Sequence, residues 1–303
     1  MVKAVLDVGS NSVLLLVARK AGDGWIPVFE SSAVTGLGYK TKSTGLLDDQ
    51  AQTRTLRAIA EAFSKARNLG ADSIFAGGTM ALRIARNTEE FLQKAADQGT
   101  PIQVISGEEE AELGFLAVAN DPLFASEQTL TIIDPGGHST ELVTATRTPN
   151  GWNTLLRKSF PVGALGLRES VMNSETPSFA DRLAAVDEID SLIGLEYLPN
   201  RAGKAVSLGA TGTNLISIKE KLSTWEPNKV HGAILDFEEV SRAVGWLCDM
   251  TDAQRSEIPG LEKGREGTIH IGSLILERFM QVTHVLDCTV SIRGWRHALL
   301  ERD

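Results

Sequence analysis

The chain of 303 residues is 42% hydrophobic, 23% charged and 6% aromatic, and its 39 acidic against 30 basic residues give a formal net charge of −9. This composition excludes a collagen-like fibre and an intrinsically disordered chain, and the length favours two domains. An acidic protein is a poor general binder of nucleic acid, so any anionic ligand requires a local site.

The sequence also argues against a membrane protein. The longest wholly apolar run, residues 13–18, is far shorter than the ~18 residues that a membrane-spanning helix requires. No basic segment followed by a long apolar one opens the chain, so we expect a cytoplasmic protein without a membrane partner. Cys248 and Cys288 lack zinc-site spacing and disulfide density, and we expect two buried, reduced thiols.

Short apolar runs alternate with amphipathic stretches, a pattern typical of an α/β fold. The first half predicts strands at 3–7, 13–19, 73–76 and 102–105, and helices at 49–69, 88–96 and 108–118. Asp48 is the expected cap of the first helix and Gly70 its stop. A polar break at 120–126 with Pro122 suggests domains of residues 1–122 and 123–293.

The second half opens as the first does, with strands at 129–134 and 141–145 around a glycine turn. Further strands are expected at 204–208 and 285–291, and helices near 163–172, 178–196, 213–222, 236–250 and 264–281. The final stretch, 294–303, predicts a helix that can return to the first domain.

One loop motif occurs in both halves. Asp7 to Ser12 and Asp134 to Ser139 share the pattern D-x-G-x-x-S, and each lies between two apolar strands. A tight glycine turn directs several N–H groups into one concavity and can grip phosphate without lysine, while the aspartate suits a divalent cation. Either loop alone could be ordinary hairpin chemistry, but the recurrence favours phosphate binding. The candidate phosphate ligands are Gly9, Ser10, Asn11, Ser12, Gly136, Gly137, His138, Ser139 and Thr140.

Two further glycine loops follow predicted strands. The segment with Gly209, Gly212 and Thr213 precedes a helix, and it is either an anion site or an ordinary turn in which Thr213 is the N-cap. The segment 76–79 has the same form and is followed by Arg83, whose guanidinium would either contact phosphate or remain solvated on a helix.

An acidic cluster opens the helix at 108–118. Ser106 and Glu109 have capping-box spacing, and acids in a first turn are stabilised by the helix dipole. Glu110 shares a face with Leu113 and Ala117, so its carboxylate should point toward protein or a cleft. It is a candidate general base for a nucleophilic water.

Several ordered segments resemble one family. They are AVLDVGSNSVLLLVA near the start, GGTMALRIARN at 77–87, VISGEEEAELGFLAV at 104–118, IIDPGGHSTEL at 132–142, SLGATGTNL at 207–215, IPGLEKGR at 258–265 and VSIRGWRHALL at 290–300. Together they resemble the short, two-domain form of the Ppx/GppA family. Its members are exopolyphosphatases and guanosine pentaphosphate phosphohydrolases of the actin, hexokinase and heat-shock ATPase superfamily.

The resemblance implies two ribonuclease-H-like domains with an active-site cleft between them and a homodimeric assembly. It implies Mg²⁺-dependent removal of the terminal phosphate from inorganic polyphosphate, from guanosine pentaphosphate (pppGpp), or from both. Glu110 matches the family's catalytic base. Asp134 and Glu141 match residues implicated in metal binding and catalysis, and Asp7 matches the aspartate of the first phosphate loop, for which we expect a metal contact.

Three departures from the family pattern weaken the assignment of the family's activity and residue roles to this chain. His138 replaces a loop glycine and Pro135 follows the aspartate; Leu14 stands where an arginine is common; and Trp295, His297 and Ala298 replace a leucine, an acid and a glycine. Two other functions therefore stay open. One is a non-catalytic sensor of polyphosphate or a guanosine alarmone, and the other is an ATP-dependent kinase of the same superfamily.

Overall fold

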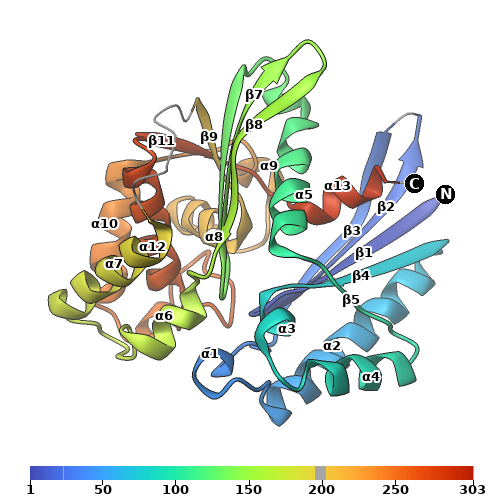
Figure 1. The fold of residues 1–303 in the computed structure, drawn as a ribbon, viewed down its shortest axis with the longest axis horizontal. Coiled ribbons are helices and arrows are strands. Elements are labelled where there is room, and N and C mark those ends of the chain that lie inside the picture. The colour runs from blue at the N-terminus through green and yellow to red at the C-terminus, as the bar shows by residue number, and fades with distance from the viewer. Residues whose placement is uncertain (23, 195–202, 303) are drawn as a thin grey trace. The chain divides into compact units, whose positions relative to one another are not determined.

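The computed structural model describes residues 1–22, 24–194 and 203–302. The chain divides into two compact units, the first comprising Met1–Leu113 with Trp295–Asp303 and the second Gly114–Gly294 (Figure 1). The division falls within helix α5 (Gly107–Ala119). The boundary after residue 122 that the sequence suggests stays a prediction.

Unit 1 is built on a five-stranded sheet of order β3-β2-β1-β4-β5. β1 (Val2–Val8), β2 (Ser12–Ala21) and β3 (Gly24–Val34) pair antiparallel, whereas β4 (Ser73–Gly78) and β5 (Gln103–Val104) continue parallel to β1. Parallel neighbours need crossover connections, and helices provide them. These helices are α1 (Thr41–Thr44), α2 (Asp49–Asn68), α3 (Met80–Ile84) and α4 (Thr88–Asp97).

Side-chain alternation gives the sheet of unit 1 two different faces. Ala4, Leu6 and Val8 of β1 enter the apolar core that α2 and α4 cover. As predicted, Asp48 caps α2, because its carboxylate accepts a 2.9 Å hydrogen bond from the Ala51 amide. Gly70 follows the helix with a left-handed φ of 76°.

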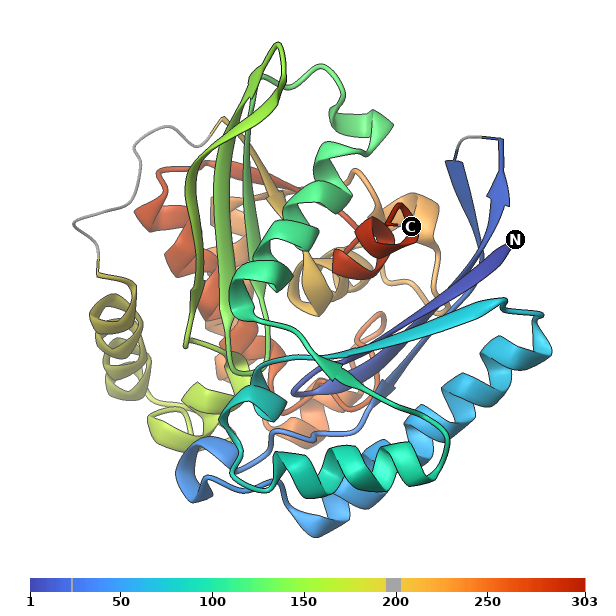
Figure 2. The same ribbon diagram turned by 45° about the vertical axis from the view of Figure 1, so that its right-hand side comes forward.

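The opposite face of the same sheet receives the C-terminal helix α13 (Trp295–Leu300), as Figures 1 and 2 show. Lys3 donates from Nζ to the carbonyl of Leu300 at 3.4 Å and to that of Arg302 at 2.6 Å. The Trp295 ring lies over Gly77, where an added Cβ would come within 2.6 Å of the ring. The last residues of the chain therefore pack on the first strands.

Unit 2 repeats this arrangement. Its six-stranded sheet has the order β10-β11-β9-β6-β7-β8. Three strands pair antiparallel, as β1 to β3 do: β6 (Thr129–Pro135), β7 (Thr140–Thr148) and β8 (Gly151–Phe160). Two strands continue the sheet parallel to β6, namely β9 (Lys204–Ser207) and β11 (Asp287–Val290). The short strand β10 (Ile234–Asp236) pairs antiparallel with β11 at the edge. Even the register shift in the second strand recurs, at Val17/Ala18 and at Thr144/Ala145.

The core of unit 2 is centred on helix α12 (Ile269–Val282), which packs against α6 (Ala164–Ser170), α7 (Phe179–Ile193), α8 (Gly209–Lys219) and α10 (Phe237–Cys248). Phe160 and Phe279 meet there edge to face at 5.7 Å. Short helices at Pro122–Phe124, α9 (Pro227–Val230) and α11 (Asp252–Ser256) complete the unit. Residues 195 and 196 of the predicted helix 178–196 lie outside the described residues.

The expected α/β fold with two mixed sheets is confirmed, and the repeated topology fits ribonuclease-H-like domains. β3 and β8 were not predicted from the sequence, because their side chains are mostly exposed and so lack the apolar runs that indicate a strand. Both cysteines are buried as expected. Burial raises the pKa of Cys248 to about 11 and that of Cys288 to about 12, so both thiols stay protonated.

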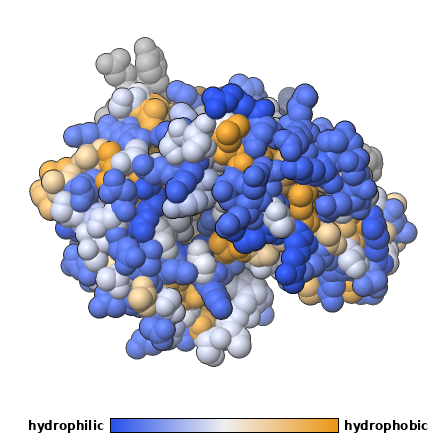
Figure 3. Space-filling model, turned by 90° about the horizontal axis from the view of Figure 1, so that it is seen from below, coloured by the Kyte–Doolittle hydropathy of each residue, from blue (hydrophilic) through white to orange (hydrophobic). Residues whose placement is uncertain are grey.

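The surface shown in Figure 3 is mostly hydrophilic, with hydrophobic patches separated by polar side chains. Large exposed hydrophobic side chains come from separate parts of the chain, with Phe179 at the start of α7 and Trp225 and Leu286 in two different loops. Within the described residues, no helix is long and apolar enough to cross a membrane. The expected homodimer stays a prediction.

Candidate functional site

The two repeated loops have the same hydrogen bond. Gly9 N–H donates to the Ser12 carbonyl at 2.9 Å, and Gly136 N–H donates to the Ser139 carbonyl at 2.8 Å. A left-handed backbone is not the reason for glycine here, because neither residue has a positive φ. A Cβ would instead come within 3.1 Å of the Ser12 oxygen in the first loop and 2.8 Å of the Ser139 oxygen in the second.

The carbonyls of the first loop are fixed by the segment that follows β3. Asn11 O accepts from the amides of Thr35 and Gly36, and Ser10 O accepts from the amide of Gly38. A trans peptide points its N–H away from its C=O. The amides of Asn11 and Ser12 therefore point away from segment 35–38, as an anion-binding loop requires.

The second loop is fixed in the same way by α6. Gly136 O accepts from the Ala164 amide, and Gly137 O accepts from the amides of Leu165 and Gly166. By the same geometry, the Gly137 and His138 amides point away from α6. Gly163 packs directly against the 137–138 peptide, so any side chain there would collide with it.

Unit 1 places the predicted base beside a predicted phosphate ligand. Arg83 Nη1 donates to Glu110 Oε2 at 2.9 Å and to the Ile105 carbonyl at 3.0 Å. Both side chains are largely buried, with exposed fractions of 16% and 13%. Arg83 Nη2 is buried and has no hydrogen-bond partner within the part of the chain that the structure describes. The first loop is connected to this pair, because Ser10 Oγ accepts from the amide of Ala81 in the helix that carries Arg83.

Burial raises the pKa of Glu110 above its ordinary value of 4.5, and the Arg83 guanidinium partly opposes this shift. The neighbouring acids of α5 have different roles. Ser106 Oγ accepts from the Glu109 amide at 3.1 Å, which matches half of the predicted capping box, and the Glu109 carboxylate pairs with Arg302 at 3.0 Å. Glu108 is exposed.

In unit 2, Asp134 and Glu141 stand directly opposite each other on β6 and β7. Side chains of such cross-strand pairs lie on one face, about 5 Å apart at Cβ. Glu141 is buried, and its Oε1 accepts a 2.6 Å hydrogen bond from Ser159 Oγ. Asp134 Oδ1 lies against Gly209, whose φ of 74° and close approach exclude a side chain. The third glycine loop thus meets the second loop.

The donor set at Asp134 and Glu141 fits Mg²⁺. Two carboxylates that leave the remaining positions to water and substrate phosphate are the usual protein contribution to a magnesium site. No cluster of three or more His, Cys, Asp or Glu ligands occurs among the described residues, so a metal here would depend on such additional oxygen ligands.

Two predicted phosphate ligands have hydroxyls that are already engaged. Thr140 Oγ1 is buried and donates to the Val162 carbonyl at 2.7 Å. Thr213 is not an N-cap, because α8 begins at Gly209 and the Thr213 hydroxyl donates back to carbonyls of the preceding turn. Gly212 gives close packing, since a Cβ there would lie 2.6 Å from Ser207 Oγ.

His138 is turned into unit 2. Its side chain is 1% exposed, and Nε2 lies 3.6 Å from Oε1 of Glu169 on α6. Neither ring nitrogen has a hydrogen-bond partner among the described residues. The side chain that replaces the family's glycine is therefore accommodated beneath the loop, and a phosphate contact by this ring stays a prediction.

A cluster of three charged side chains in unit 1 was not predicted from the sequence. Arg296 of α13 places Nη1 3.9 Å from Asp7 Oδ2 and Nη2 3.9 Å from Glu30 Oε2. Burial raises the pKa of Glu30, and Arg296 opposes that shift. No local spacing could reveal this group, because its members come from β1, β3 and α13.

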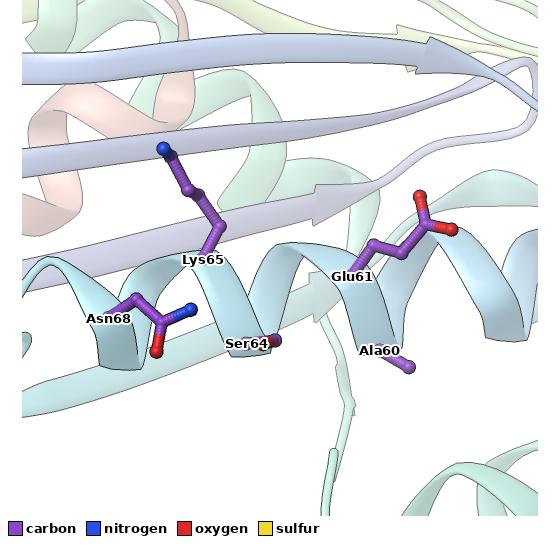
Figure 4. Close-up of a pocket in the computed structure, with 5 residues that line it drawn as sticks. All are labelled: Ala60, Glu61, Ser64, Lys65 and Asn68. Carbon is purple, nitrogen blue, oxygen red and sulfur yellow. The ribbon is translucent and has the colours of Figure 1, made fainter.

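A shallow pocket of about 480 Å³ lies along α2 and is lined by Ala60, Glu61, Ser64, Lys65 and Asn68 (Figure 4). None of the predicted site residues lines it. It lies beside the sheet of unit 1, with Lys65 Nζ 4.5 Å from the Phe29 ring centroid.

Solved structures define the class of fold. A Ppx/GppA family member from Aquifex aeolicus is 26% identical, covers 99% of this chain with 96% of its own, and superposes with a TM-score of 0.80. An exopolyphosphatase from Cytophaga hutchinsonii, 20% identical with a TM-score of 0.87 over 99% of this chain and 96% of its own, has the same fold. The class is thus a two-sheet α/β protein with a glycine hairpin in each unit.

The chain belongs to the Ppx/GppA phosphatase family, whose model matches residues 16–303. Exopolyphosphatase 2 of Mycobacterium tuberculosis is 24% identical over 288 residues, which are 90% of this chain and 88% of that protein. A bifunctional 3-dehydroquinate synthase/phosphatase of Fusobacterium nucleatum is also 24% identical, over 92% of this chain, but the chain spans only 43% of its length.

Proposed function

We propose that this protein is an exopolyphosphatase that removes the terminal phosphate of inorganic polyphosphate by Mg²⁺-dependent hydrolysis. Family membership supports a phosphatase, and several relatives are named exopolyphosphatases. The observation that carries the proposal is the buried Arg83–Glu110 pair, which combines a base and an anion ligand in one place. Both residues of this pair belong to unit 1, and the expected cleft between the domains stays a prediction.

Glu110 is the proposed general base. Its carboxylate takes a proton from a water molecule as the water oxygen attacks the terminal phosphorus. The new P–O bond forms as the phosphoanhydride P–O bond breaks, and the shortened polyphosphate leaves with the bonding electron pair. A base of this kind contributes typically 10²- to 10⁴-fold to the rate.

Arg83 is the proposed phosphate ligand beside the base. Its Nη2 is a buried donor without a hydrogen-bond partner among the residues that the structure describes, and a phosphate oxygen would supply one. Its Nη1 meanwhile orients the Glu110 carboxylate. Phosphoryl transfer depends mainly on positioning and charge neutralisation, so this arginine should matter nearly as much as the base.

The two glycine loops are the proposed phosphate cradles, through the outward amides of residues 11 and 12 and of residues 137 and 138. Mg²⁺ held by Asp134 and Glu141 would neutralise phosphate charge when bound. Guanosine pentaphosphate ends in the same kind of phosphoanhydride chain and is a second proposed substrate.

The test is orthophosphate release from long polyphosphate, short polyphosphate, pppGpp and ATP, each with and without Mg²⁺. We expect Mg²⁺-dependent release from polyphosphate. Tight polyphosphate binding without release would support the sensor, and ATP consumption that requires an added acceptor would support the kinase. Either result would overturn the proposal.

A further inference from the structure

The carboxylates that open the two repeated loops have different surroundings. In the β6–β7 hairpin the residue opposite Asp134 is Glu141, whereas in the β1–β2 hairpin the residue opposite Asp7 is Leu14. The first loop therefore lacks the cross-strand carboxylate that makes the second loop a two-carboxylate donor set. The shared D-x-G-x-x-S motif ends at Ser12 and Ser139, two residues before this difference.

Instead, an arginine of the last helix lies beside Asp7 in unit 1. The Arg296 guanidinium lies between the carboxylates of Asp7 and Glu30, with both N···O distances at 3.9 Å. Arg296 is buried at 8% exposure, and α13 is held on this face of the sheet by Trp295 over Gly77 and by Lys3. The arginine is thus part of the packed unit.

We propose that Arg296 is the resident counter-cation of Asp7 and that it keeps divalent metal off the first loop, so that Mg²⁺ is restricted to Asp134 and Glu141. A positive charge about 4 Å from a carboxylate oxygen opposes a second cation at the same oxygen, most strongly where water is partly excluded. Asp7 then orients the first loop without binding metal. This inference takes only the identity of the metal, Mg²⁺, from the proposed function.

The test counts bound Mn²⁺ by electron paramagnetic resonance on the full-length protein, with Mn²⁺ as the only added ligand. Asp7→Asn should leave the number and affinity of bound ions unchanged, whereas Asp134→Asn should weaken binding by about tenfold or more. Arg296→Gln should gain a bound ion, because it leaves the Asp7 and Glu30 carboxylates without their shared cation. Adding Asp7→Asn to Arg296→Gln should remove that gain.

Loss of Mn²⁺ affinity in Asp7→Asn would overturn the proposal, and so would an Arg296→Gln protein with no additional ion. Arg296→Lys keeps the positive charge and should bind Mn²⁺ as the unmutated protein does. Arg57→Gln is the matched control, since it removes an arginine from a fully exposed pair with Glu61 and should add no site.

The Asp7→Asn measurement needs no substitution of the packed arginine, so the proposal remains testable even if Arg296→Gln does not fold. Ion counting is independent of turnover. A protein that restricts Mn²⁺ to Asp134 and Glu141 but releases no phosphate would contradict the proposed function and leave this inference intact.

Discussion

Arg83 and Glu110 form a pair in which each residue changes the chemistry of the other. Burial raises the pKa of Glu110, and the guanidinium 2.9 Å away lowers it. The folded protein accordingly keeps the Glu110 proton to a higher pH than the unfolded chain does. The resulting contribution to stability is present below pH 4.5 and is lost as the pH rises through the folded-state value.

Removing the guanidinium should shift the pH dependence of hydrolysis. Without Arg83 the remaining burial raises the Glu110 pKa further, and the base acts only when it is ionised. In Arg83→Gln the acidic limb of kcat/KM should therefore move to higher pH, in addition to an overall loss of activity. The measurement is a pH–rate profile on polyphosphate for both proteins.

Arg83→Lys is the control for that profile, because lysine keeps the charge but not the planar fork. Its acidic limb should lie between those of the other two proteins. An Arg83→Gln limb that coincides with the unmutated one would show that the arginine does not tune the base.

Single residues differed in how far the sequence could predict them. Helical spacing and the family motif predict Glu110 as the base, the loop before Arg83 predicts a phosphate contact, and both roles stay predictions. Their mutual contact joins residues 27 positions apart, and no local pattern encodes it. The engaged hydroxyls of Thr140 and Thr213 were likewise invisible, because their acceptors are set by the packed backbone.

Among the helices and strands, one buried arginine holds several elements of unit 2 together. Arg255 of α11 is 0% exposed and donates to the carbonyls of Glu175, Leu247, Met250 and Glu266, as well as to the Asp252 carboxylate. It thereby joins the loop after α6, the end of α10 and the approach to α12. Its neighbour His270 is buried with a pKa lowered to about 2 and stays neutral.

Arg255→Met should destabilise the protein by about 3–5 kcal/mol, because it leaves the carbonyls of Glu175, Leu247, Met250 and Glu266 without their buried donor, whereas the part-exposed Asp252 carboxylate keeps its bond from Arg168. The midpoint of thermal unfolding should fall by about 10 °C or more. Arg57→Met is the control, since Arg57 is 82% exposed and should change stability by no more than about 0.5 kcal/mol. Equal midpoints for the two variants would refute the tethering role of Arg255.

Elements with strong apolar periodicity or clear caps were predicted from the sequence, as α2 with its Asp48 cap illustrates. The edge strands β3 and β8 were not, because their side chains face solvent and their pairing depends on the neighbouring strand. α8 begins at Gly209, earlier than predicted, at a position where a positive φ and the close approach of Asp134 require glycine.

In the molecule as a whole, the two sheets share one order of five strands, to which unit 2 adds β10, and they carry the same hairpin at the same place in that order. The sequence motif at residues 7–12 and 134–139 revealed this repetition. The sequence also shows that Leu14 stands seven residues after the first aspartate where Glu141 stands after the second. It could not reveal the approach of Arg296 to Asp7, because that contact depends on how the last helix packs.

The central claim is that Glu110 is the base of a polyphosphate hydrolase. It is tested most directly by orthophosphate release from long polyphosphate with Mg²⁺, comparing Glu110→Gln with the matched variant Glu108→Gln, which changes an exposed acid in the same helical turn. Glu110→Gln should still unfold at a higher temperature when polyphosphate is present, which shows that it folds and binds. We expect its rate to fall by about 10²- to 10⁴-fold while Glu108→Gln remains close to the unmutated protein; a Glu110→Gln rate within a few-fold of that protein would contradict the account.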